Sequence, residues 1–380
     1  MSSRPGRAVR RALTAIVPLA ALLSLTACGS GTTPAAGSSQ AAAPGSPGLT
    51  AARAALKTYA QRPAAISVTQ PVGKPIPKGK QIDFILCGVQ SCKDLADFFT
   101  GAAGQLGWKV KQIATQGTPE SVQAAYEQAV RDKPDAVVAS GFPRAVYAKQ
   151  LAQLKAAGVP VIQSNADDVV GDGVSLLKNG PKDVGIQGRM LASWVVSNSG
   201  AQADTVYFDL PAYTILKPVK DSFAANYKTW CAGCALDDVD VPITAVGKDM
   251  PDRVVSYLRS HPKVTHVVFS LGLLNVGVPA ALKTAGLTGK HIVVNVGDAQ
   301  NYQYIQSGLT DGAMALNSHE TAWLQVDALA RNFTGQSMAV DQKAALPNML
   351  VTKDNLPSAD GDFPIVESYQ QQFKALWGLS

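Results

Sequence analysis

The chain has 380 residues, of which 46% are hydrophobic and 16% charged, so it is long enough for more than one packed domain. Its formal net charge of +6 includes four arginines within the first 11 residues, where no acid occurs, and without them the charge is near +2. The remaining sequence has no basic stripe with interleaved aromatic residues, which argues against nucleic-acid binding.

The N-terminal residues have the pattern of an export signal. The arginine-rich stretch is followed by a short apolar run, residues 12–27, which is too short to span a bilayer comfortably. The run ends Leu25-Thr26-Ala27-Cys28 and resembles the lipobox of bacterial lipoproteins. We therefore predict a signal peptide over residues 1–27, lipidation of Cys28 and anchoring at the extracytoplasmic face of the cell membrane. The alternative is an ordinary signal peptide whose cysteine pairs elsewhere.

A segment of low complexity follows the cysteine. Residues 29–48 are rich in Gly, Ser, Pro and Ala and contain little apolar bulk, which is typical of a flexible tether. Residues 50–60 have the pattern of a short helix, to which the sequence assigns no role. We predict that residues 28–77 form a flexible tether with one short helix.

Four further cysteines form two close pairs in the sequence. Cys87 with Cys92 and Cys231 with Cys234 are predicted to form local disulfides, because an even number of cysteines at short spacing is typical of exported proteins. The second pair also resembles a thioredoxin-type redox motif. A helix is predicted to precede these cysteines, so they lack the helix N-terminus that would lower a thiol pKa, and a structural role is favoured. The four histidines show no zinc-ligand spacing with either pair, so no metal or cofactor is expected.

The rest of the chain alternates short β-branched runs with amphipathic stretches. This rhythm predicts an α/β fold in which parallel sheets are covered by helices. Because the series occurs twice, we expect two lobes. The first series has strands at 82–87, 109–113, 136–140 and 159–163 and helices at 94–106, 121–131 and 144–157; the second has strands at 205–208, 236–241, 265–270 and 291–296 and helices at 186–198, 220–230, 252–260 and 276–285.

These elements together resemble the type I periplasmic-binding-protein family, especially its ribose and sugar-type members. The resemblance covers roughly residues 78–356. Asn295 departs from the usual apolar run of the family's strand. The matching stretches are Lys80-Gln81-Ile82-Asp83-Phe84-Ile85, Gly104-Gln105-Leu106-Gly107-Trp108, Lys133-Pro134-Asp135-Ala136-Val137-Val138, Ala156-Ala157-Gly158-Val159-Pro160-Val161-Ile162 and Val293-Val294-Asn295-Val296-Gly297-Asp298.

The resemblance implies two Rossmann-like lobes joined by a three-segment hinge, with crossings near residues 178–180, 298–299 and 333–338. The N-terminal lobe would comprise residues 78–178 plus 299–333, and the C-terminal lobe residues 179–298 plus 334–380. It also implies a monomer that captures a sugar-like or less polar small molecule for the permease of an ABC importer. The alternative is a lipoprotein that presents its closed form to a membrane sensor.

In such a fold the ligand site lies at the strand ends that face each other across the cleft. The resemblance places Gln90, Ser91, Asn165 and Leu271 at pocket positions where the family usually has aromatic or clamping residues. It also places Asp298, Asn317 and Lys217 where the family has an acid, an amide and an arginine. Phe142, Leu210 and Tyr213 would add apolar walls.

Two of these assignments have structural alternatives. The apolar residues could equally belong to ordinary lobe packing, and Asp298 could be a helix N-cap.

No catalytic residue is predicted, because the sequence lacks the nucleophile elbow G-x-S-x-G. It also has Val278-Pro279 where a P-loop needs Lys and Ser or Thr.

Overall fold

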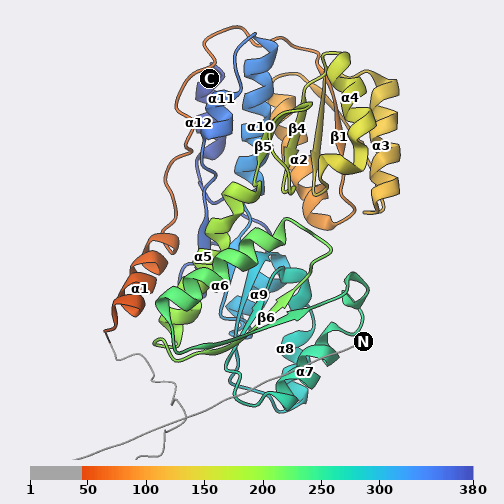
Figure 1. The fold of residues 1–380 in the computed structure, drawn as a ribbon. Helices are drawn as coiled ribbons and strands as arrows, with labels where there is room; N and C mark the ends of the chain where they lie inside the picture. The colour runs from red at the N-terminus through yellow and green to blue at the C-terminus, as the bar shows by residue number, and fades with distance from the viewer. Residues whose placement is uncertain (1–44, 380) are drawn as a thin grey trace, which may run out of the picture. The chain divides into compact units, whose positions relative to one another are not determined.

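The computed structural model describes residues 45–379 (Figure 1). The predicted signal peptide, Cys28 and most of the low-complexity linker lie outside these residues. In the described part of the chain, no helix is both long and apolar enough to cross a membrane.

The first lobe is built on a parallel sheet with the strand order β2-β1-β3-β4-β5. Side chains of β3 alternate between the two faces, since Val138 belongs to one hydrophobic core and Val137 to the other. Both faces are therefore buried, as parallel sheets require. The strands are β1 (Gln81–Ile85), β2 (Lys109–Ile113), β3 (Ala136–Ser140), β4 (Val161–Ser164) and β5 (Val174–Lys178).

The second lobe is built on a sheet with the order β11-β10-β9-β8-β6-β7, parallel except for β11, which runs antiparallel to β10. Its faces are also both buried, with Val267 in one core and Val268 in the other. The strands are β6 (Asp204–Asp209), β7 (Ala235–Asp240), β8 (His266–Phe269), β9 (His291–Gly297), β10 (Gly312–Ala315) and β11 (Met349–Thr352).

Helices cover both faces of each sheet. In the first lobe, one face carries α2 (Gln90–Gln105), α10 (Ser318–Phe333) and α12 (Tyr369–Leu376), and the other carries α3 (Pro119–Asp132) and α4 (Ala148–Ala156). In the second lobe, one face carries α1 (Pro47–Tyr59), α5 (Pro181–Asn198) and α6 (Leu216–Trp230), and the other carries α7 (Met250–Ser260), α8 (Val278–Thr284) and α9 (Ala299–Gln306). The short α11 (Ala339–Lys343) lies beside β5.

This architecture confirms the predicted fold class, two α/β lobes with parallel sheets. Each predicted strand is present, with bounds within two residues of those expected. Three helices begin four or five residues earlier than predicted: α2, α5 and α6. The residues before them, Val89, Gly180 and Ile215, give no side-chain cap to the helix, so the usual N-cap pattern is missing from the sequence.

The predicted lobe boundaries are wrong after residue 298. Residues 299–315 form α9 and β10, which stay in the second lobe, so the chain does not cross at 298–299. α11 and α12, assigned to the second lobe from sequence, belong to the first. The chain passes between the lobes between α1 and β1, then at residues 179–180, 316–317 and 344–348, and again between β11 and α12.

The N-terminal segment is also different from the predicted tether, because residues 46–77 pack against both lobes. Leu49 is buried among α5 and α6 residues, and α1 lies alongside α5 (Figure 1). Gly48 approaches the end of α6 so closely that a Cβ there would lie 2.3 Å from the Trp230 carbonyl oxygen. Farther along, Val72 is buried in the core of the first lobe.

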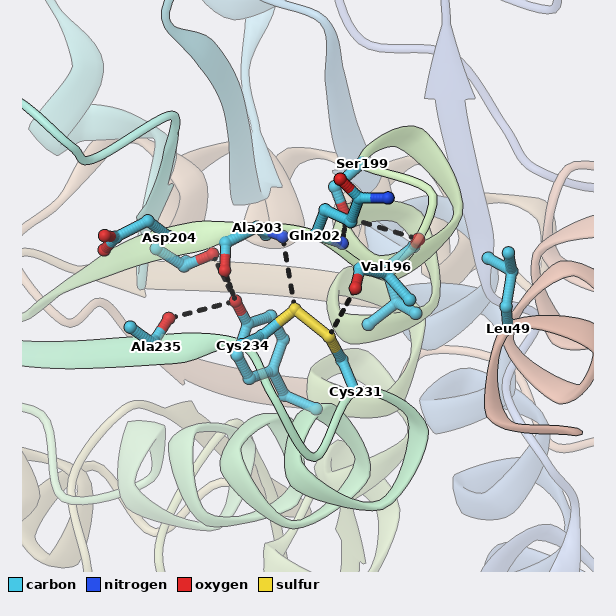
Figure 2. The surroundings of a disulfide bond; sticks show 12 residues. Leu49, Val196, Ser199, Gln202, Ala203, Asp204, Cys231, Cys234 and Ala235 are labelled. Atoms are coloured by element: carbon cyan, nitrogen blue, oxygen red, sulfur yellow. Dashed lines mark hydrogen bonds between the residues drawn. A yellow bond between two sulfur atoms is a disulfide. The ribbon is translucent and has the colours of Figure 1, made fainter. Parts of the chain in front are cut away.

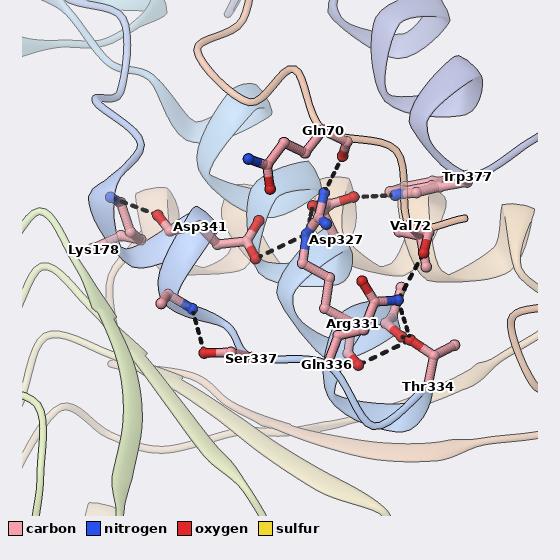
Figure 3. A network of polar contacts seen from close by, with 12 residues as sticks. Gln70, Val72, Lys178, Asp327, Arg331, Thr334, Gln336, Ser337, Asp341 and Trp377 are labelled. Atoms are coloured by element: carbon pink, nitrogen blue, oxygen red, sulfur yellow. Dashed lines mark hydrogen bonds and ion pairs between the residues drawn. The ribbon is translucent and has the colours of Figure 1, made fainter. Parts of the chain in front are cut away.

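A buried ionic cluster fixes α10 to its surroundings (Figure 3). Nε of Arg331 lies 2.8 Å from Oδ2 of Asp327 and 3.3 Å from Oδ2 of Asp341, and all three side chains are almost fully buried. Indole Nε1 of Trp377 donates to Oδ1 of Asp327 at 2.7 Å, and Arg331 also donates to the carbonyl oxygen of Gln70. The cluster thus joins α10, α11, α12 and the N-terminal segment.

Candidate functional site

A cavity of about 490 Å³ lies at the carboxyl ends of strands from both sheets. Its first-lobe walls follow β1, β3 and β4, and its second-lobe walls follow β6, β8, β9 and β10. This is where the topology of an open parallel sheet leaves space for a ligand. The lining residues include Gln90, Ser91, Asp94, Ser140, Asn165, Val184, Gln187, Tyr213, Ile215, Leu216, Val219, Leu271, Asp298 and Asp362.

The disulfide between Cys87 and Cys92 shapes the first-lobe wall. It links the loop after β1 to the first turn of α2, with 5.8 Å between the Cα atoms, and confirms the predicted pairing. The bond confines residues 88–91 to a short loop at the cavity. Within this wall, Nε2 of Gln90 donates to Oδ1 of Asp94 at 2.8 Å.

Asn165 supplies an amide from the end of β4. Its backbone has φ 51°, a left-handed conformation that asparagine tolerates better than most residues. Its Nδ2 donates to Oγ of Ser140 at 3.1 Å, which orients both polar groups at the end of the first sheet.

The second-lobe wall depends on the close packing of α5 against α6. At Gly188 of α5, a Cβ would lie 2.0 Å from the carbonyl oxygen of Val219, so only glycine permits this approach. Val184 and Gln187 of α5 and Val219 of α6 then face the cavity. Asn295 donates from Nδ2 to Oε1 of Gln187 at 3.2 Å, which explains the amide in an otherwise apolar strand.

Asp298 both caps a helix and lines the cavity. Its Oδ1 accepts from the backbone N–H of Asn301 at 2.9 Å and from Nδ2 of the same residue at 2.7 Å, at the start of α9. The residue is exposed to solvent in the cavity. The cap therefore fixes the carboxylate of Asp298 at the cavity wall.

Six of the nine predicted ligand-binding residues line the cavity: Gln90, Ser91, Asn165, Tyr213, Leu271 and Asp298. Phe142 does not, because it packs against the core between the first sheet and α3 and α4. Lys217 lies on the outer face of α6, where its side chain is 73% exposed and pairs with Asp221 at 2.6 Å. Leu210 is buried in the second-lobe core.

Asn317 also lies outside the cavity, at a passage between the lobes. Its Oδ1 accepts from Nδ2 of Asn179 at 3.0 Å, and its Nδ2 donates to the carbonyl oxygen of Pro347 at 3.0 Å. The side chain therefore joins three passages between the lobes. The structure therefore does not bring Asn317 to the cavity beside Asp298.

Several lining residues were not predicted. Asp94 begins the helix as the sequence predicts it, and its place beside the first strand end could have indicated a cavity position. Asp362 comes from the segment between β11 and α12, for which no sequence pattern was available. Placing Ile215 and Val219 at the cavity from sequence would have required the correct start of α6, which lies four residues before the predicted one.

The second disulfide, Cys231–Cys234, is not part of the cavity wall. Figure 2 shows its surroundings. It follows the C-terminal end of α6, and Cys231 is buried. Sγ of Cys234 accepts from the backbone N–H of Ala203 at 3.2 Å, just before β6. Because α6 precedes the two cysteines, neither thiol lies at its N-terminus, which agrees with a structural role for this disulfide. Among residues 45–379, no group of three or more His, Cys, Asp or Glu side chains is arranged to hold a metal ion.

A family model described as a periplasmic binding protein domain matches residues 92–337. No protein of curated function matches the sequence significantly. The matched range covers strands and helices of both lobes, including most of the cavity wall.

Solved structures share the fold at low sequence identity. An ABC transporter solute binding protein from Agrobacterium vitis with bound allitol is 18% identical, with a TM-score of 0.64 over 73% of this chain and 97% of that chain. A glucose-galactose binding protein from Geobacillus stearothermophilus is 15% identical, with a TM-score of 0.65 over 74% and 100%. A periplasmic ribose ABC transporter protein from Conexibacter woesei is 14% identical, with a TM-score of 0.65 over 75% and 95%.

Proposed function

Because the chain belongs to the type I periplasmic-binding-protein family, whose members bind solutes outside the cytoplasm and are not enzymes, we propose that it is a lipid-anchored receptor for an ABC importer. It captures a small molecule between its lobes and presents the closed form to the permease. The observation that carries this proposal is the cavity lined by strand ends of both sheets.

A ligand that contacts both walls stabilises the arrangement in which the lobes are closed around it. The walls come from two separately packed cores, and the chain passes between them in short segments. Such short passages permit a rigid-body movement of one lobe against the other. The closed form then differs in surface from the open form, and a permease can distinguish the two.

The test is a thermal-shift screen of the purified mature protein against sugars, polyols, nucleosides, amino acids and amines. A true ligand at about 100 times its Kd contributes roughly 2.7 kcal/mol, which raises the melting midpoint by several degrees. Ser91→Trp places a large side chain in the cavity and should abolish the shift. Lys93→Trp, on an exposed position of the same helix turn, should keep it. A ligand that shifts both variants equally would show that binding occurs elsewhere.

Lipid anchoring is a separate prediction. Cys28→Ser removes the sulfur that would carry the diacylglyceryl group, so metabolic labelling with a tagged fatty acid should be lost. The unprocessed precursor or shed protein should appear instead. Cys231→Ser removes a cysteine from a structural disulfide and should leave the labelling intact. Undiminished labelling of the Cys28→Ser protein would contradict the lipobox assignment.

A further inference from the structure

The cavity wall carries three carboxylates, Asp94, Asp298 and Asp362, whereas its residues include no lysine, arginine or histidine. Two buried acids outside the cavity have cationic partners. Asp168 lies 3.0 Å from Nε of Arg144, and Asp209 lies 2.9 Å from Nζ of Lys220. The cavity carboxylates have no such partner among the described residues that line the cavity.

The hydrogen-bond partners of these carboxylates are neutral. Gln90 donates to Asp94, Asn301 donates to Asp298, and the backbone N–H of Phe363 donates to Asp362. Nε2 of His319 lies 3.7 Å from Oδ2 of Asp362, but burial lowers the pKa of His319 to about 4, so this ring is neutral at physiological pH. No charge of the protein compensates the three acids within these contacts.

The three acids line the same cavity, although they come from distant parts of the chain. Burial raises the pKa of Asp362 to about 7, and the charge of Asp94 contributes to this rise. Burial also raises the pKa of Tyr302, with contributions from the charges of Asp362 and Asp298. The charges of Asp94 and Asp362 thus affect each other, and those of Asp362 and Asp298 both affect Tyr302.

The cavity wall is apolar along α5 and α6. Val184, Ile215 and Val219 form a small apolar cluster, against which Tyr213 packs, and all four side chains contribute to the cavity wall. Leu216 and Leu271 extend this surface. The cavity therefore offers an acidic region together with an apolar one.

We propose that the ligand of this cavity is a small organic cation, an amine with an apolar body whose ammonium group is received by Asp94, Asp298 and Asp362. This inference rests on the proposed solute-binding function. Closure of the lobes excludes water and strengthens the repulsion among like charges, which a cationic ligand relieves. Ammonium donors also form charge-assisted hydrogen bonds with carboxylates. A neutral polyol would leave the charges uncompensated, and an anion would be repelled.

The test uses matched pairs of probes in calorimetric titrations at pH 7.5. Alkylamines and arylalkylamines, such as cyclohexylmethylamine and 2-phenylethylamine, are compared with the alcohols that replace ammonium by hydroxyl. Ribose, galactose and allitol are titrated beside them. We expect an amine to bind at least about tenfold more tightly than its alcohol, since a hydrogen bond to a charged group has this magnitude.

Two variants test whether the preference for amines over alcohols depends on the carboxylates. Asp298→Asn removes the charge but keeps an acceptor that can cap α9, and Asp94→Asn removes a second charge from the wall. Each should weaken amine binding by about tenfold while the melting midpoint of the free protein stays unchanged. Asp354→Asn, at an exposed position outside the cavity, should bind as the natural protein does.

The outcomes separate this inference from the function on which it rests. Tight binding of a sugar or polyol with no binding of amines would overturn the cationic ligand and leave the solute-binding function in place. Amine binding that is equally strong in Asp298→Asn and Asp94→Asn would also overturn it. Failure of every probe class to bind would contradict both proposals.

Discussion

Arg331→Met should lower the free energy of unfolding by about 3–5 kcal/mol, because it leaves the buried carboxylates of Asp327 and Asp341 without a cation. Burial and the neighbouring Asp327 raise the pKa of Asp341, so this carboxyl group can take up a proton and recover part of the loss. The measurement is a urea denaturation curve at pH 7.5.

Arg253→Met is a matched control for this variant. Arg253 pairs with Asp249 at the same i,i+4 spacing, but both side chains are 48% exposed, so we expect no measurable change in stability. If Arg331→Met does not fold, combining it with Asp327→Asn and Asp341→Asn should restore folding by removing the unpaired charges. An unchanged midpoint for Arg331→Met would contradict the role of the cluster.

Gly188→Ala should destabilise the second lobe and weaken ligand binding at the same time. The new Cβ would lie 2.0 Å from the carbonyl oxygen of Val219 and 2.6 Å from the amide nitrogen of Phe223, and backbone atoms cannot move aside without separating α5 from α6. Overpacking of this kind costs about 1–3 kcal/mol or more. Since both helices carry cavity residues, their separation also displaces part of the wall.

Gly185→Ala provides the control on the same helix. A Cβ at Gly185 would lie 3.8 Å from Cβ of Ser222, an ordinary contact, and alanine favours the helix by roughly 0.5–1 kcal/mol over glycine. This variant should be as stable as the natural protein or slightly more so. Equal melting midpoints and equal ligand affinities for the two variants would rule out the proposed close packing.

The strands of both lobes could be predicted from sequence where β-branched residues form a clear run. β2 and β3 have the predicted bounds, and Ile113, Val137 and Val138 are buried as expected. β10 reads Gly-Ala-Met-Ala and contains no β-branched residue, so only its neighbours in the sheet identify it as a strand. The sequence therefore does not indicate that β10 belongs to the second sheet, and for this reason the predicted lobe boundary after residue 298 is wrong.

The cavity was predictable only in part, for reasons that differ between residues. Gln90, Asn165 and Asp298 follow strand ends, and topology alone places such residues at the carboxyl edge of a sheet. Lys217 also follows a strand end, but its position on α6 turns the side chain outward, and the late predicted start of the helix concealed this. Asp362 enters the cavity wall from a segment far along the chain, which no local pattern reveals.

A solute bound in the cavity should draw the two lobes together. Spin labels at Lys149→Cys in the first lobe and Lys248→Cys in the second, both at exposed positions, report the distance between the lobes by pulsed electron paramagnetic resonance. Labels at Lys109→Cys and Lys149→Cys, within one lobe, serve as the control. Saturation with the ligand identified by titration should shift the inter-lobe distance distribution and leave the control unchanged. A ligand that binds in the cavity without any change in the inter-lobe distances would contradict the account.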